Sequence, residues 1–224
     1  MTKSIDDKKN ISTEDYIKAI YKLAGEEGKV TTSALASQLQ LTDASVTDMI
    51  KKLSEKGLVR YARYRGVALS ARGKRMAMQI VRRHRLWEMY LVRFLGFSWD
   101  QVHNEAERLE HVTSEDLERR LDEALSFPAS DPHGDPIPGA DGSLKSSAYS
   151  PLTEYDAGDV VKVSRVSDHD SQLLQHATRI GLGINKRLIV KEKMAFDGSM
   201  LIKVGANEHF ISRQLAQSIF VFRA

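Results

Sequence analysis

The sequence predicts a mainly α-helical protein that ends in a small β-barrel. Apolar residues recur at helical spacing up to about residue 125. All five prolines then fall within 126–151, which indicates a loop or linker, and short strands follow it. We expect a winged helix-turn-helix over 1–75, a helical dimerisation domain with a Pro-rich linker over 76–150, and the barrel over 151–224.

The N-terminal part has the order of a winged helix-turn-helix. Ser12 or Thr13 is a suitable cap for a first helix, and Gly57 follows the third helix in the position where helices end. Two alternating segments around Arg63-Tyr64-Arg65-Gly66 predict a β-hairpin with a basic tip. Helices are predicted at 12–24, 32–39 and 44–56, and strands at 58–62 and 67–70.

The rest of the chain predicts helices first and strands later. The segment 72–95 has too many apolar residues for a helix with one covered face, so we expect it to pack against a second copy of the chain. Further helices are predicted at 103–111, 114–125 and 173–180. Strands are predicted at 159–166, 187–193, 200–204, 208–211 and 218–222.

Charge and composition narrow the function. The net charge is +3, but residues 1–93 carry 19 Lys and Arg against 10 Asp and Glu, whereas the remainder carries 14 against 20. The basic half is the expected nucleic-acid surface and the acidic half the expected cation-binding region. Cysteine is absent, which excludes disulfides and thiolate ligands. The sequence contains neither a secretory signal nor a membrane span, so we expect a cytoplasmic protein.

The segment 103–111 carries the chemistry. A helix there would align two imidazoles and two carboxylates at i, i+4, i+7 and i+8, namely His103, Glu107, Glu110 and His111. A solvated charged face is the competing interpretation. Leu109, Val112 and Leu117 supply an adjacent apolar face, where unpaired carboxylates are costly. The pattern is half of a metal site, and taken alone it leaves both interpretations open.

Several motifs together resemble the diphtheria toxin repressor and manganese transport regulator family of metal-activated bacterial transcriptional regulators. The matching segments are Glu14-Asp15-Tyr16, Arg83-His84-Arg85-Leu86-Trp87-Glu88, Val102-His103-Asn104-Glu105-Ala106-Glu107, Glu110-His111-Val112 and Gly134-Asp135-Pro136-Ile137-Pro138-Gly139. The resemblance covers nearly the whole chain. It implies a homodimer, an SH3-like (FeoA-like) third domain and repression of metal-uptake genes.

The resemblance also implies two metal sites. The primary site would comprise Asp15, His84, Glu107, Glu110 and His111. The candidates for a secondary site are Glu88, His103, Asp131, His133, Asp168 and Asp170. Oxygen and nitrogen ligands suit Mn(II), and Fe(II) is the alternative. The manganese regulators that bind a metal pair have Glu where this chain has Lys18, which favours a single ion at the primary site.

The expected partner is a double-stranded, palindromic DNA operator, read by two heads about 34 Å apart or a multiple of that distance. An ion shared by the DNA-binding and dimerisation domains would shift the population toward the binding arrangement. Base-edge candidates are Thr42, Ala44, Ser45, Thr47 and Asp48. Phosphate candidates are Lys51, Lys52, Arg60, Arg63 and Arg65.

Two other classes of function remain open at this point. His and Glu clusters also hold hydrolytic metals, so a metalloenzyme is one alternative. Against it, the sequence shows no nucleophile-base pair or phosphate-binding loop, and we expect no enzymatic activity. A winged-helix regulator that binds an organic effector, in which the Glu and His residues of 103–111 are merely structural, is the other alternative. No organic substrate is expected.

Overall fold

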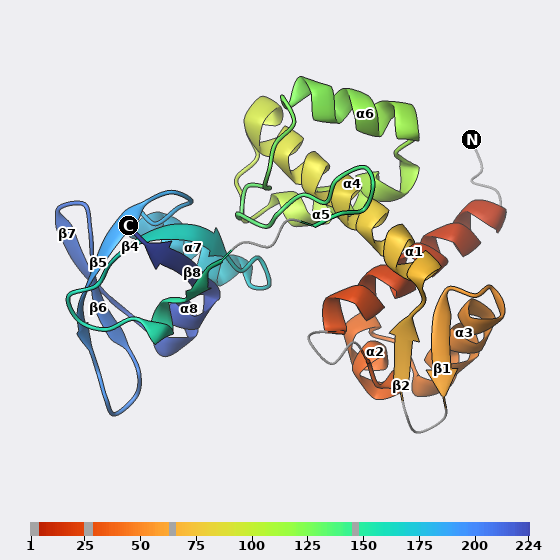
Figure 1. The fold of residues 1–224 in the computed structure, drawn as a ribbon, viewed down its shortest axis with the longest axis horizontal. Helices are drawn as coiled ribbons and strands as arrows, with labels where there is room; N and C mark the ends of the chain where they lie inside the picture. The colour runs from red at the N-terminus through yellow and green to blue at the C-terminus, as the bar shows by residue number, and fades with distance from the viewer. Residues whose placement is uncertain (1–4, 25–28, 63–65, 145–147) are drawn as a thin grey trace. The chain divides into compact units, whose positions relative to one another are not determined.

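The computed structural model describes residues 5–24, 29–62, 66–144 and 148–224, and Figure 1 shows their elements. The chain forms two compact units. The first extends to His84 and includes Glu110–Thr113 and Pro138–Ser143; the second comprises Arg85–Leu109, Ser114–Ile137 and Leu144–Ala224. Among the described residues, no helix is long and apolar enough to cross a membrane.

The winged helix-turn-helix forms as predicted. It consists of α1 (Ile5–Leu23), α2 (Thr32–Leu39), α3 (Asp43–Glu55), β1 (Val59–Ala62) and β2 (Gly66–Leu69). The two strands pair antiparallel, and Figure 1 shows this hairpin beside α3. In α3 the buried residues Val46, Ile50 and Leu53 follow the helical period and face the core.

The helix starts show where a polar residue predicted from the sequence as an N-cap does act as one. The Thr42 hydroxyl accepts a hydrogen bond from the backbone N–H of Ser45, and Thr42 is therefore the N-cap of α3. The predicted cap of the first helix is wrong, because α1 begins at Ile5 and passes through Ser12 and Thr13. A polar residue caps a helix only where the chain before it leaves the helical conformation. Arg63 and Arg65 of the predicted wing lie outside the described residues.

The central helices differ from the prediction at one informative place. They are α4 (Ala71–Leu95), α5 (Val102–Leu109), the 3₁₀ turn η1 (Glu110–Val112) and α6 (Glu115–Ala124). The predicted helix over 103–111 ends early, because its last turn tightens into η1. Glu110 and His111 therefore do not continue the α-helical face of His103 and Glu107. Glu110 is completely buried.

The C-terminal part is an antiparallel sheet with two short helices. Its elements are β3 (Ser150–Pro151), η2 (Leu152–Glu154), β4 (Val160–Val166), α7 (Ser171–Arg179), β5 (Arg187–Lys193), β6 (Met200–Val204), β7 (Asn207–Ile211), α8 (Arg213–Ser218) and β8 (Ile219–Arg223). The strand order is β3-β8-β4-β5-β6-β7. In the described residues β3 and β7 do not pair, so the expected barrel is a sheet that does not close. Val161, Val190 and Ile202 are fully buried in its core.

Candidate metal centres

The first cluster of ligating side chains lies in the first unit, between α1, α4 and η1. The imidazole of His111 has a carboxylate from α1 at each nitrogen. Its Nδ1 is 2.6 Å from Oε2 of Glu14, and its Nε2 is 2.9 Å from Oδ1 of Asp15. The same Nε2 is 3.5 Å from Oε1 of Glu110. Three carboxylates thus surround one largely buried ring.

The charge state of His111 follows from this environment. Burial alone would lower the pKa of His111, but the hydrogen bonds to Asp15 and Glu14 and the charge of Glu110 outweigh burial and raise the pKa to about 10. Without metal the ring is therefore an imidazolium that donates from both nitrogens. A metal ligand must be a neutral imidazole, so a bound cation takes the place of the ring proton.

Glu110 and His84 form the second half of the same cluster. Oε2 of Glu110 is 2.5 Å from Nδ1 of His84, and both side chains are almost completely buried. The ammonium of Lys18 donates to both Glu110 oxygens, at 2.8 and 2.6 Å, and lies 3.1 Å from His84 Nδ1. The buried carboxylate thus has the ammonium of Lys18 on α1 as its counter-charge.

A divalent cation fits this set of donors. The first unit brings together four of the five residues that the family resemblance implies: Asp15, His84, Glu110 and His111. Their oxygen and nitrogen atoms suit Mn(II) or Fe(II). In the absence of metal, the imidazolium of His111 and the ammonium of Lys18 compensate the charge of the carboxylates. The fifth residue, Glu107, lies on α5 in the second unit, where its Oε1 is 3.5 Å from Nε2 of His103.

Two residues of this cluster were missed at the level of sequence. Glu14 is adjacent to Asp15 and was named only as part of the matching segment Glu14-Asp15-Tyr16, yet its carboxylate contacts His111. Lys18 follows Glu14 by four residues and was considered only as a departure from the family pattern. A lysine one turn after two acids, among the apolar residues Ile17 and Ile20, was the available signal of a buried cation.

The second cluster lies wholly in the second unit. His103 Nδ1 is 3.4 Å from Oε1 of Glu88 and 3.7 Å from Oδ2 of Asp168. Glu88 also faces the loop after α6, because its Oε2 is 3.8 Å from Nδ1 of His133. Glu88, Asp131 and His133 are all buried and offer ligand atoms within 4.8 Å of one another. The structure thus gathers five of the six secondary candidates.

An unsatisfied nitrogen shows that the second cluster fits a cation. The Nε2 of His133 is 2.7 Å from the carbonyl oxygen of Trp99, and the two rings stack. Its Nδ1 is buried without a hydrogen-bond partner among the described residues. Burial and the charges of Glu88 and Asp135 raise the pKa of Asp131 to about 8. Burial lowers the pKa of His133, but the interaction with Glu88 and the charge of Asp131 raise it to about 9.

The sixth candidate has a different role. Asp170 is the N-cap of α7, where its carboxylate accepts the backbone N–H of Gln172 at 2.8 Å. Nothing in the described geometry brings it to His103 or Glu88. Its prediction as a ligand rested on the family resemblance, and the cap explains an aspartate at this position.

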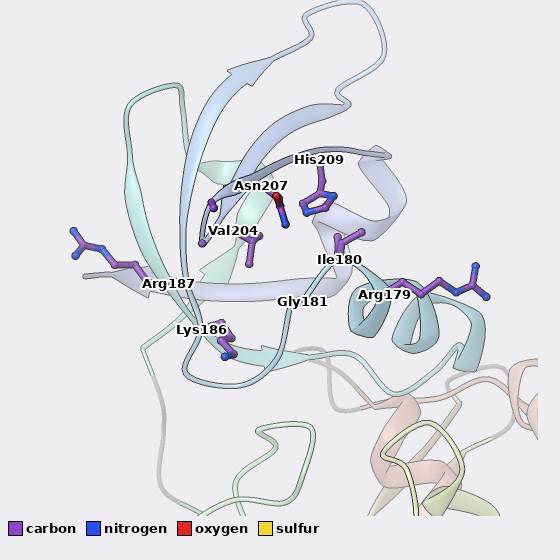
Figure 2. A pocket seen from close by; sticks show the side chains of 10 residues that line it. Arg179, Ile180, Gly181, Lys186, Arg187, Val204, Asn207 and His209 are labelled. Carbon is purple, nitrogen blue, oxygen red and sulfur yellow. The ribbon is translucent and has the colours of Figure 1, made fainter.

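A hollow on the C-terminal sheet has the wrong charge for a metal centre. It has a volume of about 480 Å³, and Figure 2 shows the side chains that line it. Its ionisable lining residues are Arg179, Lys186, Arg187 and His209, with no carboxylate among the lining residues. Both arginines extend away from the hollow in Figure 2. The two clusters above therefore remain the metal candidates.

Those DNA-contact candidates that the structure describes lie on and beside α3. Ala44, Ser45 and Asp48 are exposed, as are Lys52 and Arg60. The hydroxyls of Thr42 and Thr47 are engaged locally, with Ser45 and with the backbone carbonyl of Asp43 respectively. The carboxylate of Asp48 is 3.3 Å from Lys51 Nζ, and this exposed pair is weak enough for either side chain to turn to DNA.

Glu14→Gln tests whether Glu14 orients His111. We expect the affinity for Mn(II) to fall about 10- to 100-fold, because a carboxylate that accepts a ring N–H fixes the orientation of a ligating imidazole and raises its basicity. Titration calorimetry measures the effect. Glu115→Gln, on the exposed first turn of α6, is the control and should leave the affinity unchanged. Equal affinities for the two variants would contradict the role.

Comparisons with known proteins match three segments that together make up most of the chain. The "Iron dependent repressor, N-terminal DNA binding domain" family matches residues 10–67, and its "metal binding and dimerisation domain" matches 70–139. The FeoA domain matches 150–223. These matches confirm the predicted fold class and support DNA and a second copy of the chain as partners.

Individual relatives and solved structures match this chain over most of its length. The iron-dependent repressor IdeR of Mycobacterium leprae is 32% identical, with 94% of this chain and 96% of the relative covered. The diphtheria toxin repressor of Corynebacterium diphtheriae is 32% identical, with 76% and 81% covered. The structure of a manganese-dependent transcriptional repressor in complex with manganese has a TM-score of 0.87 and 38% identity, with 95% and 100% covered.

These relatives are transcriptional repressors and not enzymes, which decides against the metalloenzyme alternative. One of them is named for its dependence on iron and another for its dependence on manganese, so both of these depend on a metal ion but on different ones. The resemblance noted in the sequence is confirmed, and this chain belongs to the diphtheria toxin repressor and iron-dependent repressor family of metal-dependent, DNA-binding transcriptional repressors.

Proposed function

We propose that this protein is a Mn(II)-activated repressor of metal-uptake genes that binds a palindromic operator as a homodimer. The observation that carries the proposal is the contact of α1 with η1, in which Asp15 and Glu14 enclose the imidazole of His111. The helix α1 belongs to the matched DNA-binding segment, and His111 belongs to the matched metal-binding segment. Metal and DNA binding thus involve the same helix.

The proposed primary ligands are Asp15, His84, Glu107, Glu110 and His111. Glu107 is included because it precedes Glu110 by three residues and the family pattern places a ligand there. When bound, the ion supplies two positive charges that compensate the carboxylates of this cluster. Asp15 then holds the N-terminal helix in one position relative to His111, and this restricts the DNA-binding elements that pack on α1.

Mn(II) is favoured by the chemistry of the donors. The cluster offers carboxylate oxygens and imidazole nitrogens, and the chain contains no cysteine. Hard donors of this kind suit Mn(II), and nearly as well Fe(II). Fe(II) is therefore the second candidate, supported by the 32% identity to the iron-dependent repressor of Mycobacterium leprae.

The proposal extends to the second cluster and to the partners. A second ion would be held by Glu88, His103, Asp131, His133 and Asp168, with the unsatisfied His133 nitrogen as one donor. We propose domain boundaries after residues 75 and 150, and the separate family matches to 10–67, 70–139 and 150–223 support a division into three parts. Phe94 and Leu95 at the end of α4 are each 56% exposed and offer apolar surface for the second protomer.

DNA binding that depends on metal is the expected result. Fluorescence anisotropy with a palindromic operator selected from random DNA should show at least 100-fold tighter binding with Mn(II) than with chelator, because the metal selects the binding arrangement. Parallel titrations with Fe(II) and Zn(II) rank the metals. Asp15→Ala should abolish the response, whereas Asp116→Ala, on the exposed face of α6, should retain it.

Two outcomes would contradict the proposal. Equal operator affinity with Mn(II) and with chelator would exclude metal activation. The second outcome combines two variants: Asp15→Ala responds to metal like the wild type, whereas Glu110→Gln does not respond. In that case α1 would contribute no ligand to the metal centre, and the proposed coupling between metal and DNA binding would be wrong.

A further inference from the structure

Lys18 is a buried cation within the set of proposed metal ligands. Its side chain is 5% exposed, and its ammonium donates to both oxygens of Glu110, at 2.8 and 2.6 Å. His84 Nδ1 is a further 3.1 Å contact. An ammonium donates hydrogen bonds and accepts none, so Lys18 satisfies the two Glu110 oxygens much as a coordinated ion would.

The charge on Lys18 has two consequences. Glu110 is completely buried, and a buried carboxylate without a counter-charge is strongly destabilising. Lys18 therefore keeps the cluster assembled when no metal is present, and it ties α1 to α4 and η1. At the same time, a second cation that approaches Glu110 is repelled by the ammonium and needs the same carboxylate oxygens.

We propose that Lys18 is an internal competitor of the metal ion: it occupies Glu110 in the metal-free protein and so raises the metal concentration at which the repressor responds. The inference rests on the proposed function. Lys18 acts on binding through Glu110 and is not itself a ligand. The acid that contacts the Lys18 ammonium is Glu110 on η1, and the imidazole of His84 on α4 lies 3.1 Å from it.

A purely structural role for Lys18 predicts a different change in metal affinity when the lysine is replaced. If Lys18 only stabilises the fold, its removal leaves metal affinity unchanged or weakens it, because Glu110 loses its orientation. If Lys18 competes, its removal frees Glu110 and removes a positive charge from the site, so metal affinity rises. The sign of the change distinguishes the two roles.

Titration calorimetry with Mn(II) on the full-length protein measures this sign. Lys18→Met keeps most of the aliphatic chain and removes the charge, and we expect the Kd for Mn(II) to fall at least tenfold. Lys18→Arg retains the charge and should stay within about threefold of the wild type. Lys22→Met makes the same chemical change one helical turn away, on an exposed part of α1, and should have no effect. Unchanged or weaker binding by Lys18→Met would overturn the proposal.

A measurement on the wild type covers the case in which Lys18→Met does not fold. Amine acetylation followed by mass spectrometry should show Lys18 protected in the metal-free protein and at least fivefold more reactive at saturating Mn(II), because the ammonium has lost Glu110. Equal protection in both states would overturn the proposal. If the wild type binds no divalent cation at all, the proposed function fails instead, so the two failures are distinguishable.

Discussion

Glu110→Gln is expected to lower the free energy of unfolding of the metal-free protein by about 3–5 kcal/mol, the usual cost of removing one partner from a buried ion pair. Glu110 is completely buried and lies 2.5 Å from His84 Nδ1 and 2.6 Å from Lys18 Nζ. Without the carboxylate, the ammonium of Lys18 stays buried without its counter-charge. Urea unfolding in the presence of chelator measures the loss.

The same variant is expected to lose its response to Mn(II), because the proposed centre then lacks the carboxylate that His84 and His111 both approach. Operator binding should become equally weak with metal and with chelator. Glu105→Gln is the matched control: Glu105 forms an exposed pair with Arg108 at 2.9 Å, and its replacement should cost no more than about 0.5 kcal/mol. A Glu110→Gln protein as stable and as metal-responsive as this control would contradict both expectations.

Elements with strong local signals were predicted well from the sequence. The helix α2 and the strand β6 have the predicted bounds, because apolar period and turn residues agree there. The strand β3 and the helix α8 were missed, since they have two and six residues and are too short to show a period. Their positions depend on pairing and packing with β8, which lies far along the chain from β3.

The candidate sites show the same division between local and tertiary information. The His and Glu side chains that we propose as ligands were visible in the run from His103 to His111. How that run divides was not visible, because the α5 helix ends at Leu109 and the 3₁₀ turn carries Glu110 and His111 into the first unit. Lys18 is separated from Glu110 by 92 residues, so no local pattern relates them.

Glu88→Gln tests the second cluster, which lies in the second unit. Glu88 is 1% exposed at its side chain, 3.4 Å from His103 Nδ1 and 3.8 Å from His133 Nδ1. Glu88→Gln leaves both imidazoles without their shared carboxylate. We expect the free energy of unfolding to fall by about 3 kcal/mol in metal-free protein, because a buried charged partner is removed.

The metal content distinguishes a structural role from ligation in that variant. Titration calorimetry should detect one Mn(II) site fewer per protomer in Glu88→Gln than in the wild type, while binding at the first cluster persists. Asp170→Asn is the matched control, because asparagine caps a helix about as well as aspartate and the α7 cap is the role that the geometry gives Asp170. If Asp170→Asn also removes a site, Asp170 is a ligand after all. If Glu88→Gln loses stability but keeps every site, the buried cluster serves the fold alone, and the unsatisfied nitrogen of His133 must be satisfied by water.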